Sequence, residues 1–174
     1  SLNVFFKIIK DGEKVSFTDG KITVDITGTN FHKGMDRPEN INDYIVTNKT
    51  ADYHIHIVHG MLTSKSYGKL FKHTLIDQIT DTEADITFCG HDHVGFGNIN
   101  YKNKWFVNPG AIVRLSSAEN ELNRTVKVVL VTIDKDGVLL TDIPLKSARP
   151  SNEVLSRTHI EEAQEKEAYE DFIK

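Results

Sequence analysis

The sequence predicts a mixed α/β fold, with α+β layering in which sheets are flanked by helices. Three observations support this prediction. Strand-like segments separated by Asp-Gly turns fill the first third of the chain, strand and helix patterns alternate in the middle, and a β-branched hairpin precedes an acidic helical segment at the end. A chain of 174 residues is about one domain long and can bury a real core.

The amino-terminal third is expected to be β-structure. Two Asp-Gly turns divide it into three expected strands, at residues 4–10, 14–17 and 21–29. Residues 28–43 are polar and rich in turn-forming residues, so they predict a long loop, and long loops inside compact domains are usually functional or mobile. The apolar alternation over residues 53–58 then predicts a strand that enters a buried sheet.

The hydrophobic period changes in the middle of the chain. Apolar residues recur at three- and four-residue spacing over residues 67–79, which predicts an amphipathic helix. The apolar segment 84–90 ends in a glycine and predicts a short buried strand. Two hairpins are expected next, over residues 98–108 and 125–145, the second rich in β-branched side chains.

The end of the chain differs from its body in composition. Residues 148–152 read as a linker, and the acidic segment 159–173 that follows has the pattern of an amphipathic helix. We therefore expect one body over residues 1–147, followed by a linker and an acidic C-terminal helix over residues 148–174.

Composition excludes several classes of protein. The lone Cys89 can form no internal disulfide, so a reducing, cytoplasmic compartment is expected. No apolar run approaches the eighteen or so residues of a membrane span, so no membrane partner is expected. The net charge of −4 lacks the basic footprint of a simple nucleic-acid binder. A nucleic-acid enzyme is still compatible with this charge, because a metal site brings its own positive charge.

Three histidines directly follow predicted strands. His59 follows the strand 53–58, and His91 and His93 follow the strand 84–89, in each case beside a glycine. Ligands gather at the carboxyl ends of strands in open α/β sheets, and imidazole is the commonest nitrogen ligand for zinc, manganese and iron. We therefore expect His59, His91 and His93 to converge on one metal site. A surface loop with solvated histidines is the simpler alternative for an isolated His-x-His pair.

Three segments resemble the calcineurin-like metallophosphoesterases: HIVHGML at 56–62, ITFCGHDHVGFG at 86–97 and FVNPGAIVRL at 106–115. In that family a strand-end His-Gly pair, a Gly-His-x-His segment and an Asn-Pro-Gly-Ser turn follow one another, and here Ala111 replaces the serine. The tract that begins at HGML looks closest to the DNA-repair-exonuclease branch. The family's earlier motifs (Asp-x-His, Gly-Asp with a bridging aspartate, and Gly-Asn-His) have no counterpart at the expected place in residues 1–58.

The resemblance therefore implies the C-terminal half of a larger enzyme, part of a two-sheet sandwich whose N-terminal portion is absent. The complete enzyme would hydrolyse phosphodiesters, DNA exonuclease activity being one form, with two divalent metals bridged by a hydroxide nucleophile. Mn²⁺ is expected, with Fe, Zn or Ni as alternatives. His59 and His91 would bind one metal and His93 the other. The catalytic residues are unknown and expected in the missing segment, so residues 1–174 alone are expected to be inactive.

Three further residues are candidates for supporting or substrate-contacting roles. Asp92 could orient an imidazole or be a solvated loop residue, Asn108 belongs to a turn expected to be structural, and Arg114 could bind a substrate phosphate or form a surface ion pair. His54 and His56 alternate with isoleucines on a predicted strand, so buried, hydrogen-bonded side chains are expected there rather than metal ligands.

Two other functions compete with the phosphoesterase. The chain could be a catalytically inactive binding or scaffold module of the same fold, which would suit a chain that lacks half of the metal motifs. A structural zinc domain using Cys89 is disfavoured, because no second cysteine completes a tight site. The expected partners are a phosphodiester substrate, DNA included, and either the missing N-terminal segment or a second copy of the chain.

Overall fold

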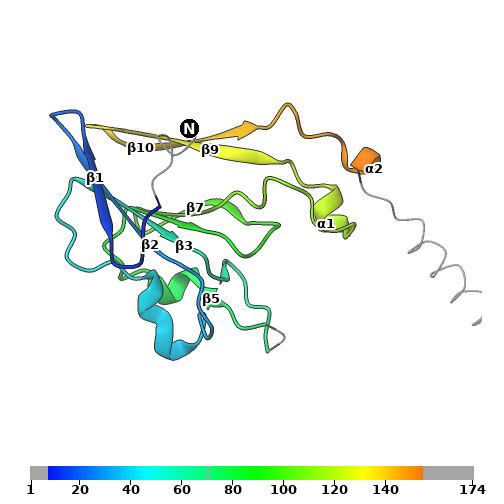
Figure 1. Ribbon diagram of the computed structural model, residues 1–174, viewed down its shortest axis with the longest axis horizontal. Helices are drawn as coiled ribbons and strands as arrows, with labels where there is room; N and C mark the ends of the chain where they lie inside the picture. Colours follow the sequence, from blue (N-terminus) through cyan, green and yellow to red (C-terminus); the bar gives the residue numbers. More distant parts are fainter. Residues whose placement is uncertain (1–7, 70, 155–174) are drawn as a thin grey trace, which may run out of the picture.

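A mixed six-stranded sheet forms the middle layer of the protein (Figure 1). The computed structural model describes residues 8–69 and 71–154. In spatial order the strands of this sheet are β1 (Lys14–Thr18), β2 (Thr23–Thr29), β3 (Tyr53–Val58), β6 (Ile86–Cys89), β8 (Lys104–Asn108) and β7 (Gly97–Tyr101). The four inner strands run parallel, while β1 and β7 are antiparallel edges. The inner strand β6, ITFC, is buried over most of its length, as expected of an inner parallel strand.

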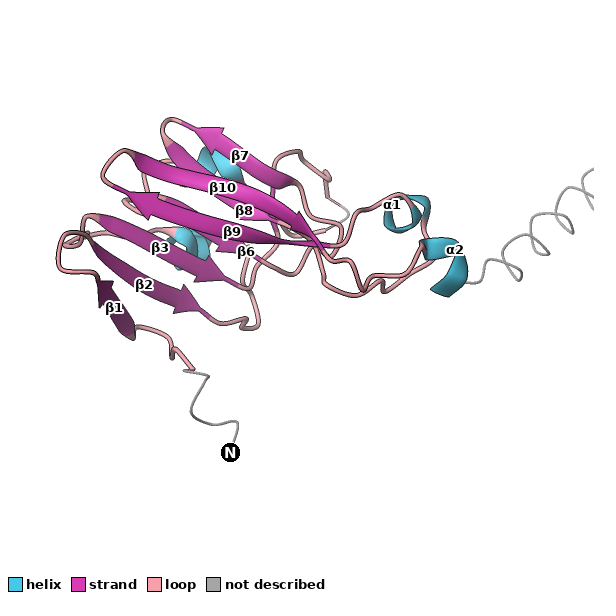
Figure 2. Ribbon diagram, turned by 90° about the horizontal axis from the view of Figure 1, so that it is seen from above, coloured by secondary structure: helices cyan, strands magenta, loops and turns pink. Residues whose placement is uncertain are grey.

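A long hairpin covers one face of this sheet, as Figures 1 and 2 show. It consists of β9 (Lys127–Asp134) and β10 (Gly137–Pro144), paired antiparallel. Tyr53 Oη donates to the Asp134 carbonyl at 3.1 Å, and Asn98 Nδ2 donates to Asp142 Oδ1 at 2.9 Å, so side chains of the central sheet bind the hairpin directly. The predicted α/β fold with two facing sheets is therefore confirmed.

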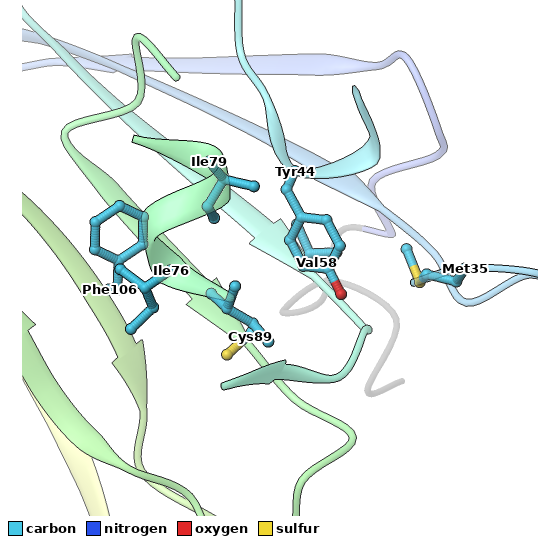
Figure 3. Packing of buried hydrophobic residues seen from close by; sticks show 8 residues of the cluster. Met35, Tyr44, Val58, Ile76, Ile79, Cys89 and Phe106 are labelled. Carbon is cyan, nitrogen blue, oxygen red and sulfur yellow. The ribbon is translucent and has the colours of Figure 1, made fainter. Parts of the chain in front are cut away.

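Short 3₁₀ helices and a small sheet cover the other face. These elements are η2 (Pro38–Tyr44), η3 (Ile76–Ile79) and the parallel pair β4 (Leu62–Thr63) and β5 (Thr74–Leu75). The main core lies between them and the central sheet, and Figure 3 shows most of its members. Its buried residues are Met35, Tyr44, Val58, Leu62, Ile76, Ile79, Cys89 and Phe106. The burial of Cys89 agrees with the sequence expectation.

The predicted amphipathic helix over residues 67–79 is wrong. The segment forms turns, the strand β5 and the single 3₁₀ turn η3. His73 explains part of the difference, because its ring bonds the Tyr67 backbone nitrogen at 3.3 Å and the Phe71 carbonyl at 2.8 Å and so stabilises a tight turn. The three-residue spacing of Ile76 and Ile79 is satisfied by the 3₁₀ turn, in which residues i and i+3 share one face.

Most of the other predicted strands are confirmed, while some predicted segments are not in a sheet or lie outside the described residues. The strands over 14–17, 21–29 and 53–58 and both hairpins are confirmed. Residues 8–10 of the first predicted strand are not extended in a sheet, and its other residues lie outside the described part of the chain, as does the helix predicted over 159–173. Three short helices among the described residues were not predicted: η2, which lies largely in the predicted loop 28–43, α1 (Glu119–Leu122) and α2 (Ser151–Val154). No helix within the described ranges is long and apolar enough to cross a membrane.

Candidate active site

Two of the predicted histidines lie close together at the carboxyl ends of two inner strands of the central sheet. β3 and β6 are parallel neighbours with Val58 opposite Cys89, so the residues that follow them emerge side by side. The Gly90 nitrogen donates to the Val58 carbonyl at 3.1 Å and extends this alignment past the strands. As a result the rings of His59 and His91 lie 5.5 Å apart between centroids, nearly edge to face at 75°.

Phe31 completes an aromatic cluster with these histidines. Its ring stacks on His91 at 5.5 Å and 10°, and meets His59 edge to face at 6.2 Å. Stacking covers a face of an imidazole but leaves its nitrogens free, because their donor or lone-pair directions lie in the ring plane. Sequence reasoning missed Phe31. The one signal was its place in the polar loop 28–43, where an aromatic residue has no core to fill.

The loop after β6 is held in an unusual conformation. His91 has a φ of 71°, in the left-handed region that side chains with a Cβ seldom adopt. The buried Asn108 amide donates to the Asp92 carbonyl at 3.0 Å, while its oxygen accepts from the Gly110 nitrogen at 3.0 Å. Asp92 Oδ1 accepts from the Val94 nitrogen at 3.1 Å, which makes it a turn-forming residue. Asn108 and Asp92 therefore shape the loop that carries His91 and His93.

Two glycines allow this loop to pack against the Asn-Pro-Gly turn, backbone on backbone. Gly95 has a φ of 74°, and a Cβ added there would come closer than 3.0 Å to backbone atoms of Asn108 and Gly110. Gly110 has a φ of 82°, and a Cβ there would come as close to the carbonyl oxygens of His93 and Val94. The Ala111 nitrogen also donates to the His93 carbonyl at 2.8 Å. This contact requires glycine at both positions.

The two nearby arginines bind backbone. Arg114 Nη1 donates to the Glu121 carbonyl, so this guanidinium holds the strand-to-helix connection together, and contact with a substrate phosphate stays a prediction. Arg124 is buried and donates to the carbonyls of Ala111 at 2.6 Å and Val113 at 3.0 Å while pairing with the buried Glu121 carboxylate at 3.1 Å. Sequence reasoning missed Arg124 and Glu121, because nothing in a polar stretch indicates which charges will be buried.

A buried carboxylate connects the loop 28–43 to the turn that carries His59. Asp36 accepts hydrogen bonds from the Tyr44 hydroxyl, from Thr74 Oγ1 at 2.9 Å and from the Met61 nitrogen at 2.9 Å. Burial and the neighbouring Asp36 carboxylate raise the pKa of Tyr44 far above its ordinary value, so the phenol stays a donor. A Cβ on Gly60, the residue after His59, would collide with the Tyr44 hydroxyl, which makes Gly60 a requirement of this packing.

His54 and His56 are buried and hydrogen-bonded, as expected from the sequence. His56 Nε2 lies 2.9 Å from the Asp43 carbonyl, so this nitrogen carries the proton and Nδ1 accepts from Thr27 Oγ1 at 2.8 Å. The Thr27 oxygen then accepts from His54 Nε2 at 2.8 Å, which leaves His54 Nδ1 as a buried nitrogen without a hydrogen-bond partner among the described residues. Burial lowers the pKa of both histidines, and the neighbouring His56 lowers that of His54 further.

A cleft of about 860 Å³ opens beside the loop after β6. His91, Asp92, His93 and Val94 line one part of it, and residues 115–121 supply much of another. Phe71 and Lys72, from the turn that replaces the predicted helix, also line it. His93, the third predicted ligand, therefore shares a cleft with His91.

Comparison with known proteins assigns the family. A model described as the calcineurin-like phosphoesterase superfamily domain matches residues 9–136. The chain belongs to the calcineurin-like phosphoesterase superfamily. No curated protein matches the chain. A solved structure described as a "Putative 5'-Nucleotidase from Staphylococcus aureus in complex with alpha-ketoglutarate" is similar with a TM-score of 0.41 and 16% identity. The match covers 78% of this chain and 30% of that one.

The calcineurin-like family implies a metal centre that the described residues fit only in part. Within residues 8–69 and 71–154, no three His, Cys, Asp or Glu side chains lie close enough together to hold a metal ion. The paired imidazoles of His59 and His91 are suitable donors, but two ligands do not make a complete centre. Burial raises the pKa of Cys89, which keeps it a thiol and disfavours the structural zinc alternative. A shared metal site for His59, His91 and His93 stays a prediction.

Proposed function

We propose that this chain is the C-terminal part of a metal-dependent phosphoesterase that hydrolyses phosphodiesters. One observation carries the proposal: in a chain of the calcineurin-like superfamily, two imidazoles meet where neighbouring parallel strands end, beside a cleft. Ligands of open α/β sheets bind beside the carboxyl ends of the strands. Bound divalent metals, Mn²⁺ first among the candidates, would stabilise negative charge on phosphate oxygens and supply a hydroxide nucleophile.

In this proposal His59, His91 and His93 are the ligands that this chain contributes, and the others come from a segment beyond the described residues. Asn108 fixes the conformation of the loop that carries two of the ligands. Phe31 keeps the His91 ring in place by stacking. DNA exonuclease activity in the cytoplasm is the narrower form of the proposal, supported by the resemblance of the tract after His59 and by the presence of a single cysteine, which suits a reducing compartment.

The test uses the full gene product and a generic substrate, bis(p-nitrophenyl) phosphate, with and without Mn²⁺. We expect Mn²⁺-dependent hydrolysis that falls at least about a hundredfold in His91→Ala and in His93→Ala, because loss of one ligand strongly weakens a metal site. His32→Gln is the matched control, since His32 is an exposed loop histidine paired with Asp43. Residues 1–174 alone are expected to show negligible turnover. Turnover by residues 1–174 that is abolished by His91→Ala would contradict the part of the proposal that takes the remaining ligands from beyond the described residues.

A binding or scaffold module is the second candidate function. It is favoured by the incomplete ligand set among the described residues. A full-length protein that melts cooperatively, binds no Mn²⁺ by calorimetry and hydrolyses no phosphodiester would establish this alternative and exclude the enzyme.

A further inference from the structure

The cleft beside His91 is lined by apolar side chains, a lysine and two histidines, among others. Phe71 and Leu115 line it with side chains that are 60% and 53% exposed, so apolar surface in the cleft is open to a ligand. Lys72, His91 and His93 line it too. Its volume of about 860 Å³ lies within the range of small-molecule sites.

Phe71 is exposed but held in place. The Tyr67 ring meets it edge to face at 6.4 Å and 84°, and Tyr67 in turn packs against the ring of His73 at 5.9 Å. His73 closes the turn by bonding the Phe71 carbonyl at 2.8 Å and the Tyr67 nitrogen at 3.3 Å. A ring that is already oriented by contacts such as these loses less freedom when a ligand stacks on it, so this arrangement favours a planar ligand.

Lys72 is the cationic side chain of the cleft lining that an anionic ligand can reach. Glu121 lines the cleft, but its carboxylate is paired with the buried Arg124 at 3.1 Å. One carboxylate oxygen of Asp92 accepts a hydrogen bond from the Val94 nitrogen within the same turn. No described residue forms an ion pair with Lys72, which leaves its ammonium group available to a ligand. A lysine binds phosphate as a point charge without a fixed geometry.

We propose that Phe71 and Lys72 form a substrate-recognition arm that selects phosphoesters carrying a planar ring, that is, a nucleotide unit. Phe71 stacks on the base, and Lys72 directs the phosphate toward His91 and His93. The inference rests on the proposed function and adds its specificity-determining residues. A free mononucleotide and the end of a DNA strand present the same chemistry to this arm, and the test separates them.

The test measures binding by calorimetry to the full-length protein without added metal, so that turnover plays no part. The probes are dTMP, 2-deoxyribose 5-phosphate, thymidine and a 5′-phosphorylated pentathymidylate. The variants are Phe71→Leu and Lys72→Gln. Phe17→Leu is the matched control, since Phe17 is 58% exposed on β1 and does not line the cleft. Lys135→Gln is the second control, on a turn where its side chain is 84% exposed.

We expect dTMP to bind at least about tenfold more tightly than 2-deoxyribose 5-phosphate, which lacks the base that stacks on Phe71, and than thymidine, which lacks the phosphate that binds Lys72. Phe71→Leu should weaken dTMP about tenfold without changing 2-deoxyribose 5-phosphate. Lys72→Gln should weaken both phosphate ligands and leave thymidine unchanged. Both control variants should match the wild type. Tighter binding of the pentanucleotide assigns the arm to strand ends, and equal binding assigns it to free nucleotides.

Equal affinity of wild-type protein for dTMP and 2-deoxyribose 5-phosphate, or an unchanged dTMP affinity in Phe71→Leu, would overturn the inference. Absence of hydrolysis with Phe71-dependent dTMP binding retained would count against the proposed function alone. Hydrolysis with ring-independent binding would count against the recognition arm alone.

Discussion

At the scale of single residues, the buried carboxylate of Asp36 holds the polar loop 28–43 against the turn that follows His59. Three donors converge on it, two from side chains and one from the backbone of Met61. A buried carboxylate is tolerated only when its oxygens are satisfied, and here both oxygens accept hydrogen bonds. Asp36 is therefore a positioning residue for His59, through Gly60 and Met61.

Replacing Asp36 by Asn should destabilise the protein by about 2 kcal/mol, because one oxygen becomes an NH₂ group that faces donors. The shift in free energy of unfolding can be measured by urea denaturation, and the His59 ring resonances should move as well. Asp136→Asn is the matched control, since the Asp136 carboxylate is exposed on a turn beside Lys135. Equal effects of the two substitutions would show that Asp36 has no special structural role.

The buried histidines predict an acid-sensitive fold. The pKa values of His54 and His56 are lowered by burial, so on acidification the unfolded chain binds protons first, near pH 6.5. Stability should therefore fall as pH drops below about 6.5, by up to about 1.4 kcal/mol per pH unit for each histidine, until the folded-state pKa values are reached. Urea denaturation at pH 7.5 and pH 5.5 measures this fall.

His32 acts with the opposite sign. Its partner Asp43 raises the pKa of His32, so this pair stabilises the fold below about pH 6.5 and loses its effect as pH rises through the folded-state pKa. Because the pair is partly exposed, its contribution is smaller than that of the buried histidines. His32→Gln should therefore steepen the acid-induced loss of stability. An NMR titration in which His54 or His56 has a pKa above 6.5 would contradict the prediction that burial of these two histidines makes the fold acid-sensitive.

At the scale of elements, the contact between the loop after β6 and the Asn-Pro-Gly turn depends on the absence of side chains at two positions. Gly95 and Gly110 each place their Cα against backbone of the other segment. Together with the Asn108 amide, they fix the loop of His91 and His93 to β8, so the rigid part of the candidate site extends across two strands of the central sheet.

Gly95→Ala should cost several kcal/mol, because the added methyl group collides with backbone that cannot move aside easily. Gly97→Ala separates this collision from backbone strain, since Gly97 also has a positive φ, 80°, but nothing lies within 4 Å of an added Cβ. That control should cost only about 1–2 kcal/mol, the ordinary penalty of the left-handed conformation. Thermal melts of both variants measure the difference, and similar losses would refute the close backbone contact.

Local patterns predicted the strands well, because alternation and β-branched runs are written in consecutive residues, as in 53–58 and 127–134. The convergence of His59 and His91 was also predictable, since both follow apolar segments that pair in parallel. The helix over 67–79 failed because its apolar spacing also fits a 3₁₀ turn, while side-chain bonds of His73 favour turns. Phe31, Asp36 and Arg124 act through partners distant in sequence, which local patterns do not reveal.

At the scale of the whole molecule, the covering hairpin is apolar on both faces. Its outer face carries Val128, Leu130, Leu139 and Ile143, which are 40–62% exposed, and the register places Val128 beside Ile143. A strand pair that covers a sheet with one face usually shows polar residues on the other. Among the described residues no further strand pairs with the outer edges of β9 and β10, which adds hydrogen-bonding groups to this surface and favours association.

We therefore expect residues 1–174 to self-associate through the outer face of the β9–β10 hairpin. An interface of about 1,000 Å² at roughly 25 cal/mol per Å² supplies a large gross driving force, from which the costs of association are subtracted. Leu130→Lys with Leu139→Lys should weaken association at least about tenfold, because two desolvated ammonium groups would face the interface.

Thr18→Lys with Thr47→Lys adds the same charge at exposed positions elsewhere and should leave association unchanged. Sedimentation velocity at micromolar concentration distinguishes the outcomes: a wild-type monomer, or equal weakening by both pairs of lysines, would show that this face is not the interface.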